Sequence, residues 1–363
     1  MYNCFYEKYL QVYLCCFKNP GSNERILVLQ LKSASFIMNK ILFFFFLLII
    51  PDLYAQNRSR AGNAVILDTD IGPDYDDVGA MAVMHALADR GELRPIAVIA
   101  SNKNELVVPV ISILNTYFGR PELPTGAPKG TGADFGAQQK WPEMLVEKYK
   151  PAITKTSDAP DAVETYRKIL AKEADQSVTI VTIGFLTNLA DLLDSKPDKI
   201  SPLDGPALVR KKVKQLVSMA GKFPEGREYN VYADSVSSAK VFTEWPTEIL
   251  FSGFEIGEKV KTGLRLVANE QLNSPVKEVY AMAMPMNKED EAGRMSWDQT
   301  AVLVAARGVQ PYFGLKRGRI TIEGGNNKWQ DDPMGPHAYL TPNMPVEQLV
   351  AVIEGLMMWQ GKK

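Results

Sequence analysis

Five carboxylates lie within ten consecutive residues, from Asp68 to Asp77, in the segment DTDIGPDYDD. Like charges confined this closely repel one another and raise one another's pKa values. Two features could offset the repulsion: the positive end of a helix beginning near Asp76, and a bound hard cation, for which carboxylate oxygens are preferred ligands. Gly72 and Pro73 permit the tight turn that would fold the acids around one point. The segment therefore indicates a site for a hard cation.

Three other interpretations of the acidic segment stay open at this stage. The first is a helix cap, in which Asp74 or Asp76 accepts amide hydrogen bonds and the other acids are solvated. The second is an EF-hand, which fits poorly because the twelfth position counted from Asp68 is Gly79, where that loop needs a glutamate. The third is a phosphatase, since Asp68 and Asp70 have the Asp-x-Asp spacing of an aspartyl-phosphate nucleophile.

The elements that must position these acids alternate between apolar runs and segments of helical periodicity. Apolar runs predict strands at 64–68, 95–100, 178–183, 215–220 and 248–251. Helical spacing predicts helices at 76–91, 105–118, 186–193, 235–245, 297–307 and 346–358. This alternation is typical of a single α/β domain with a mostly parallel central sheet flanked by helices. Ligands of such sheets bind beyond the carboxyl ends of the strands, which is where the acidic segment falls.

The composition narrows the class of protein. The chain is 46% hydrophobic and 23% charged, as in an ordinary globular protein. Lys and Arg number 41 against 42 Asp and Glu, and this balance argues against a broad nucleic-acid or anionic-membrane surface. Only two histidines are present, His85 and His337, so a His-rich zinc site is excluded. No nucleic-acid partner is expected, and homo-oligomer formation is left open.

The amino-terminal region has the pattern of an export signal. Met38-Asn39-Lys40 precedes the apolar run ILFFFFLLII and an exit at Ala55, which predicts a signal peptide at 38–55. We expect 1–37 to be an upstream translation artefact or an unstructured extension, and 56–363 to form the catalytic domain. All three cysteines precede the cleavage point, so neither disulfides nor a lipoprotein-type membrane anchor is expected. The predicted location is periplasmic or secreted.

The acidic segment resembles the opening motif of the inosine-uridine preferring nucleoside hydrolases, a calcium-binding DxDxGxDD pattern of which DTDIGPDYDD looks like a longer form. Three later segments are similar to family motifs in the same order. They are TIGFLTNL at 182–189, Glu228-Tyr229-Asn230 followed by Ala233-Asp234, and WDQTA at 297–301. The resemblance runs from Ala64 to the last helix. It implies a nucleoside hydrolase-like fold and hydrolysis of ribonucleosides to ribose and free base.

The resemblance also implies roles for individual residues. Asp70 matches the aspartate that binds calcium and takes a proton from the attacking water. Asp77, Asp298 and the backbone carbonyl of Ile183 match the other calcium ligands. The positions that match substrate-binding residues are Asp76, Asn102, Glu228, Asn230 and, where many members have a histidine, Trp297. The implied reaction is direct attack by calcium-bound water on the sugar carbon.

Two departures bear on how the base leaves. The histidine proposed to protonate the base is Trp297 here, and a family acid-amide position is Lys222. Stacking of a purine on an indole face could favour its protonation, so Trp297 is expected near the base and purine ribosides are the expected substrates. Trp141 and Trp329 are further candidates for this stacking. His337 could also reach the site from its loop. The competing function is a calcium-dependent riboside-binding protein with impaired catalysis.

Overall fold

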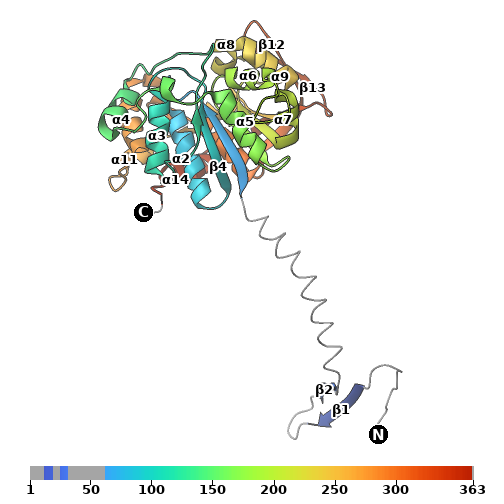
Figure 1. Cartoon of the computed structure of the whole chain (residues 1–363). Coiled ribbons are helices and arrows are strands. Elements are labelled where there is room, and N and C mark those ends of the chain that lie inside the picture. The colour runs from blue at the N-terminus through green and yellow to red at the C-terminus, as the bar shows by residue number, and fades with distance from the viewer. Residues whose placement is uncertain (1–11, 19–24, 32–61, 362–363) are drawn as a thin grey trace. The chain divides into compact units, whose positions relative to one another are not determined.

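The structure, a computed structural model, describes residues 12–18, 25–31 and 62–361 (Figure 1). The chain divides into two units, Met1–Arg60 and Ala61–Lys363. In the first, strands β1 (Val12–Lys18) and β2 (Arg25–Leu31) pair antiparallel, within the segment predicted to be an artefact or an unstructured extension. The predicted signal peptide, 38–55, lies outside the described residues. The remaining description concerns the second unit.

A ten-stranded sheet runs through the second unit in the order β5-β4-β3-β6-β7-β9-β14-β12-β13-β8. The seven strands from β5 to β14 pair in parallel, and the last three are antiparallel. This confirms the predicted mostly parallel sheet. The strand bounds are β3 (Asn63–Thr69), β4 (Leu93–Ala100), β5 (Thr125–Gly126), β6 (Val178–Thr182), β7 (Val213–Met219), β8 (Glu225–Arg227), β9 (Glu248–Ser252), β12 (Phe313–Glu323), β13 (Asn326–Asp331) and β14 (His337–Pro342).

Helices cover both faces of the sheet (Figure 1). Alternate strand residues point to opposite faces, so Val65 and Leu67 join one hydrophobic core and Ala64 and Ile66 the other. The first core contains side chains of α2 (Asp76–Asp89), α3 (Val107–Tyr117), α4 (Trp141–Tyr149), α12 (Pro275–Ala283), α13 (Trp297–Arg307) and α14 (Val346–Met357). The second contains those of α5 (Ala162–Lys172), α6 (Thr187–Asp194), α7 (Gly205–Lys212) and α9 (Ser235–Glu244).

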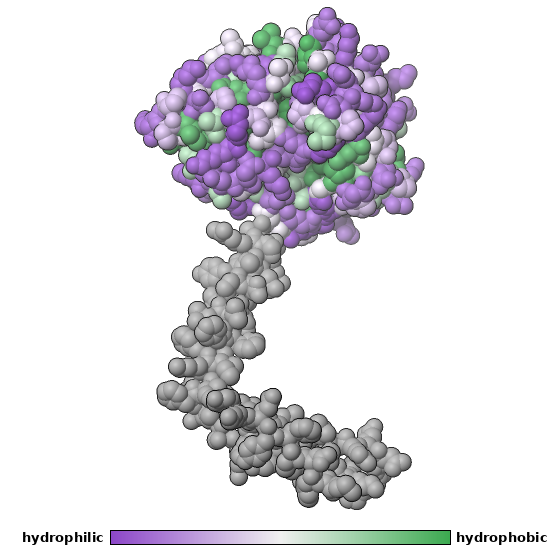
Figure 2. Space-filling model, turned by 90° about the vertical axis from the view of Figure 1, so that its right-hand side faces the viewer, coloured by the Kyte–Doolittle hydropathy of each residue, from purple (hydrophilic) through white to green (hydrophobic). Residues whose placement is uncertain are grey.

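Short elements complete the unit. Strands β10 (Lys261–Thr262) and β11 (Arg294–Met295) form a two-stranded antiparallel sheet of their own. The short helices are α8 (Tyr229–Ala233), α10 (Phe254–Gly257) and α11 (Leu264–Ala268), with 3-10 turns at Thr156–Asp158, Met284–Met286 and Lys288–Asp290. None of the helices in the described part of the chain is long and apolar enough to cross a bilayer. On the face drawn in Figure 2, hydrophilic residues predominate and hydrophobic ones form separate groups.

Close packing of α2 against α13 fixes the parts of the chain that carry the acidic residues. A Cβ at Gly79 of α2 would lie 2.4 Å from the Gln299 Nε2 of α13, so the glycine leaves room for this side chain. Asp76 and Asp77 occupy the first turn of α2, where the helix dipole favours negative charge. The fold therefore brings the residues around Asp77 and Asp298 together, although 221 positions separate them.

Candidate active site

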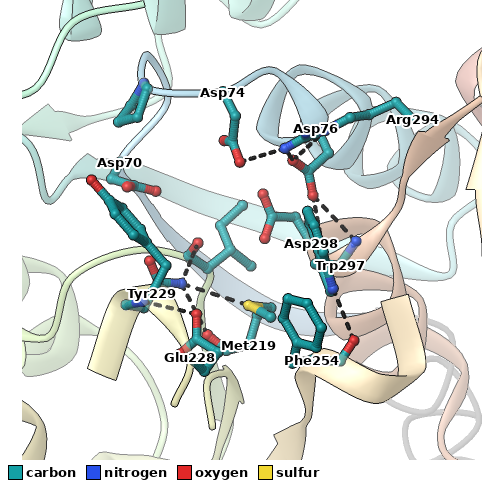
Figure 3. Close-up of a pocket in the computed structure, with 13 residues that line it drawn as sticks. Asp70, Asp74, Asp76, Met219, Glu228, Tyr229, Phe254, Arg294, Trp297 and Asp298 are labelled. Atoms are coloured by element: carbon teal, nitrogen blue, oxygen red, sulfur yellow. Dashed lines mark hydrogen bonds and ion pairs between the residues drawn. The ribbon is translucent and has the colours of Figure 1, made fainter. Parts of the chain in front are cut away.

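A cavity of about 230 Å³ opens at the carboxyl edge of the parallel strands (Figure 3). Asp70 follows β3, Ile183 follows β6 and Met219 ends β7, which is where ligands of such sheets bind. The cavity is lined by Asp70, Pro73, Asp74, Asp76, Ile183, Met219, Glu228, Tyr229, Asn230, Phe254, Arg294, Trp297 and Asp298. The structure thus gathers segments predicted from distant parts of the sequence into one pocket.

Asp70 is held at the cavity wall by close backbone contacts. A Cβ at Gly184 would lie 2.6 Å from both the amide nitrogen and the Oδ1 of Asp70, so the glycine leaves room for this carboxylate. The Asn102 Nδ2 donates to the Asp70 carbonyl at 3.1 Å and to the Phe135 carbonyl at 2.8 Å, and its Oδ1 accepts from the Phe135 amide. Asn102 is fully buried, is absent from the cavity lining and connects Asp70 to Phe135.

Asp77 is fully buried and does not line the cavity. Its Oδ1 accepts from the Thr69 hydroxyl, whereas its Oδ2 is buried and has no hydrogen-bond partner. Asp298, at the second position of α13, is also almost fully buried and does line the cavity. A buried carboxylate oxygen without a partner carries the full penalty of lost hydration, unless a ligand supplies the missing contact.

Burial and mutual repulsion disfavour the ionised forms of these acids. Burial raises the pKa of Asp70 well above its usual value, and the charge of Asp74 raises it further. The pKa values of Asp77 and Asp298 are likewise raised, first by burial and then by neighbouring aspartates, Asp70 for the former and Asp76 for the latter. A cation at this point would relieve the repulsion among all of them.

Arg294 supplies one cation, and nothing in the sequence motifs predicted it. Its Nη2 lies 2.7 Å from the Asp76 Oδ1 and 2.5 Å from the Asp74 Oδ2, and its Nε donates to Asp76 at 3.2 Å. The Asp76 Oδ2 accepts from the amides of Trp297 and Asp298 at 3.2 and 3.4 Å. Asp76, predicted to bind substrate, thus lines the cavity and also joins α2 to the start of α13.

The opposite wall is built from the segment Glu228–Asn230. The Glu228 Oε1 accepts from the Asn230 amide at 2.8 Å, and its Oε2 accepts from the amides of Gly221 and Val231 at 3.0 and 3.1 Å. The Asn230 Nδ2 donates to the carbonyls of Ile183 and Met219 at 3.3 and 3.2 Å. In this structure the Ile183 carbonyl, predicted to bind the metal, therefore contacts Asn230.

Aromatic side chains stand beside this wall. Tyr229 lines the cavity and is 49% exposed, and Phe135 is 41% exposed. Their rings and that of buried Phe185 lie 5.7 to 6.2 Å apart, centre to centre. Trp297 also lines the cavity, but its Nε1 donates to the Phe254 carbonyl at 2.9 Å, and the Arg294 guanidinium lies 5.1 Å from its ring centre.

The other aromatic and histidine candidates lie away from the cavity, so the structure corrects the suggestions that they contact the base. Trp141 is fully buried in the core, and Trp329 packs on Phe223 and Tyr339. His337 is buried in β14, where its Nδ1 accepts from the Ile320 amide. His85 is also fully buried.

The phosphatase interpretation also fails. Asp68 would be its nucleophile, yet this carboxylate is fully buried and absent from the cavity lining. Its Oδ2 accepts from the Tyr166 hydroxyl at 2.7 Å and from the Asn188 Nδ2 at 3.0 Å. Asp68 therefore has a structural role, because its hydrogen bonds connect β3 to α5 and α6.

The polar groups at the cavity include carboxylates, amides and a guanidinium. Within residues 62–361, no three acidic, histidine or cysteine side chains stand in a metal-binding arrangement. The chemistry nevertheless fits a hard cation, because the orphaned Asp77 Oδ2 and the mutually repelling Asp70 and Asp298 are all carboxylate oxygen donors. Neither thiolate nor imidazole lies among the residues lining the cavity.

Comparison with known proteins gives consistent results. A plant nucleoside hydrolase has the same fold, with a TM-score of 0.62 and 20% identity over 82% of this chain and 99% of its own. A purine-preferring ribonucleoside hydrolase from Gardnerella vaginalis gives a TM-score of 0.63 and 16% identity over 81% and 99%. In sequence, the pyrimidine-specific ribonucleoside hydrolase RihA of Salmonella agona (strain SL483) is 28% identical over 248 residues, 63% of this chain and 74% of that protein.

A family description covers most of the chain. The model of the inosine-uridine preferring nucleoside hydrolases matches residues 65–336, which include every residue of the cavity lining. The match confirms the resemblance seen in the four sequence motifs. The chain therefore belongs to the inosine-uridine preferring nucleoside hydrolase family and is a ribonucleoside hydrolase, an enzyme that acts on N-glycosyl compounds.

Proposed function

We propose that this enzyme cleaves ribonucleosides with water activated by Asp70, and that a calcium ion bound by Asp70, Asp77 and Asp298 assists it. The observation that carries the proposal is the buried, unpartnered Asp77 Oδ2, together with the charge repulsion of Asp77 with Asp70 and with Asp298. When bound, calcium would neutralise these charges and supply a Lewis acid for the sugar hydroxyls and the water. The Ile183 carbonyl is a further candidate ligand.

Asp70 is suited to accept the proton of the attacking water at a carboxylate oxygen. Its carboxylate lines the cavity, and a carboxylate within hydrogen-bond reach of the attacking water can act as its general base. Contacts from Gly184 and Asn102 restrict its backbone, so the carboxylate is held in one place before substrate arrives.

The Glu228 wall is suited to the sugar. Cleavage of a glycosidic bond builds positive charge on the ring, as in other glycoside hydrolyses. Glu228 places a buried negative charge beside the cavity, and its three amide contacts keep that charge fixed. Asn230 and Asp76 complete the polar lining on opposite sides, and Asn102 supports the site from behind it.

Tyr229 and Phe135 are suited to the base, because Tyr229 lines the cavity and the exposed Phe135 ring lies 6.2 Å from the Tyr229 ring, centre to centre. A purine offers the larger stacking surface, so we retain purine ribosides as the preferred substrates. Trp297 can contribute a ring edge, although its indole is already engaged by Phe254 and Arg294. The RihA relative is named pyrimidine-specific, so the comparison of inosine with uridine decides this point.

Export is proposed on the sequence pattern alone. The Met38-Asn39-Lys40 start, the apolar run and Ala55 support cleavage near Gln56 and a periplasmic or secreted enzyme. Amino-terminal sequencing of protein recovered from cell fractions tests this. Protein that begins at Met1 in the cytoplasm would contradict it.

Ribose release from inosine, adenosine, uridine and cytidine tests the proposed function. Protein stripped with a chelator and then supplied with calcium should release ribose, and inosine should react faster than uridine. Asp70→Asn, which keeps the side-chain shape, is the matched control and should be nearly inactive. Full activity after exhaustive chelation would contradict the role of calcium, whereas faster uridine cleavage would contradict only the base preference.

A further inference from the structure

We propose that Arg294 is a positioning residue that holds Asp298 in the active site by acting through Asp76. This inference rests on the proposed function, because it gives Asp298 the role of a calcium ligand. No sequence motif pointed to Arg294. Its assignment comes from its ion pairs with Asp74 and Asp76, which Figure 3 draws, and from a further contact with Asp290.

Arg294 and Asp76 form a close ion pair. Two nitrogens of the guanidinium reach the same oxygen of Asp76, at 2.7 and 3.2 Å. The side chains are 7% and 1% exposed, so water does not screen the pair. Truncating one partner of such a buried pair leaves an uncompensated charge and is strongly destabilising. Asp76 is therefore fixed by Arg294 on one side.

The other carboxylate oxygen of Asp76 connects this residue to the start of α13. It accepts from the amides of Trp297 and Asp298, the first two residues of α13. These amides have no partner within the helix, and a carboxylate at a helix amino terminus is stabilised by the helix dipole. Because Asp298 is the residue whose amide is bound, any movement of Asp76 would shift the Asp298 carboxylate.

Aromatic and acidic side chains surround the Arg294 guanidinium. It lies 4.9 Å from the ring centre of Tyr75 and 5.1 Å from that of Trp297. The Tyr75 hydroxyl donates to the Asp290 Oδ2 at 2.5 Å, and the other oxygen of Asp290 lies 3.8 Å from the Arg294 Nη1. A planar guanidinium satisfies these contacts together, whereas the ammonium of lysine is a single point charge.

Arg307 provides a matched control elsewhere in the chain. It lies at the carboxyl end of α13 and forms its own ion pair with Glu92, with an Nε–Oε2 distance of 2.6 Å. That pair is 19% and 30% exposed and does not border the cavity. Arg307→Lys therefore makes the same chemical change at the far end of α13 without touching Asp76.

The experiment is calorimetric titration of the chelator-stripped protein with calcium alone. Arg294→Lys should weaken calcium binding at least tenfold, and Arg307→Lys should change it less than twofold. In an Asp76→Asn background, Arg294→Lys should add little further loss, because its effect passes through Asp76. Unchanged affinity in Arg294→Lys, or full additivity with Asp76→Asn, would overturn the proposal.

Circular dichroism and thermal unfolding establish that each variant is folded before titration. If Arg294→Lys does not fold, Arg294→Gln removes the buried charge while keeping an N–H donor, and the same tenfold loss is expected. Absence of calcium binding by the unmodified protein would instead contradict the proposed function. The two failures are therefore distinguishable.

Discussion

The buried carboxylates on two sides of the cavity differ in how completely their oxygens are hydrogen-bonded. We call Asp70 and Asp298, which line the cavity, together with the buried Asp77, the acidic wall, and Glu228 with Asn230 the amide wall. Each carboxylate oxygen of Glu228 accepts a backbone amide, and Asn230 donates to two carbonyls. On the acidic wall one oxygen of Asp77 has no partner, and like charges crowd together.

The difference indicates two kinds of preorganisation. On the amide wall, hydrogen bonds within the protein stabilise the negative charge before any ligand binds. The acidic wall stays unfavourable until a ligand compensates its charges, and such local conflicts are expected at functional sites. Substitutions on the two walls should therefore differ in both activity and stability.

The largest expected effect is on activity at the acidic wall. Asp70→Asn removes the oxygen that accepts the water proton, and proton transfer of this kind contributes about 10²–10⁴-fold. We expect kcat for inosine to fall by about that factor, as measured by ribose release. A variant that keeps more than a tenth of the activity would show that another group takes the proton.

Stability should respond with opposite signs on the two walls. Without metal, Asp77→Asn removes one of several repelling charges and should raise the free energy of unfolding by about 1–3 kcal/mol. Glu228→Gln puts an amide group where backbone N–H groups need an acceptor, and should lower that free energy by about 1–3 kcal/mol.

Chemical unfolding of both variants in chelator provides the measurement, with added calcium as the second condition. Calcium should stabilise the unmodified protein and Glu228→Gln, but not Asp77→Asn, which has lost a ligand. Destabilisation of the metal-free protein by both substitutions would remove the distinction between the walls.

The two walls also differ in how far the sequence could predict them. The acidic segment is local, so its strand, turn and helix were predictable from residues 64–91, and the structure gives β3 and α2 there. The strands β12 to β14 and helices α4, α5, α7 and α12 were not predicted. Exposed positions within β12 and β13 break the apolar run that identifies a buried strand.

Arg294 escaped prediction for a different reason. Its partners Asp74 and Asp76 precede it by 220 and 218 positions, and their contact depends on how β11 and α13 dock against α2. An isolated arginine carries no local signal of such a role. Trp297 shows the converse: its place at the cavity was predictable from the WDQTA motif, whereas its bond to the Phe254 carbonyl was not.

A smaller effect is expected where the amide wall meets the aromatic rings. Tyr229→Ala removes a stacking surface, and base stacking on an aromatic side chain is worth about 1–3 kcal/mol. KM for inosine should rise by roughly 5–150-fold. Tyr229→Phe keeps the ring and should stay close to the unmodified enzyme. Equal losses in both variants would assign the effect to the hydroxyl and contradict stacking.

His85 lies away from both walls, so its substitution should have the smallest effect on activity. Burial and the nearby charge of Arg120 lower the pKa of His85 to about 3, and its Nε2 bonds to the Asn115 Oδ1 at 3.0 Å. The unfolded chain gains a proton at this residue near its ordinary pKa of 6.5, whereas the folded protein stays neutral. Stability from His85 is therefore present above pH 6.5 and is lost progressively as the pH falls toward 3.

This sign is opposite to that of the acidic wall, where burial raises the pKa of Asp70 and acidification favours the folded state of the metal-free protein. From the shift of His85 we expect a loss of about 2 kcal/mol between pH 7 and pH 5. Unfolding of His85→Gln across this range, in chelator, isolates the contribution. The variant should lose less stability than the unmodified protein while keeping its activity at pH 7, because His85 contacts neither wall. An unchanged slope would mean that the acid response of the fold comes from ion-paired carboxylates whose pKa is lowered, such as Glu92, or from His337, whose pKa burial lowers to about 4.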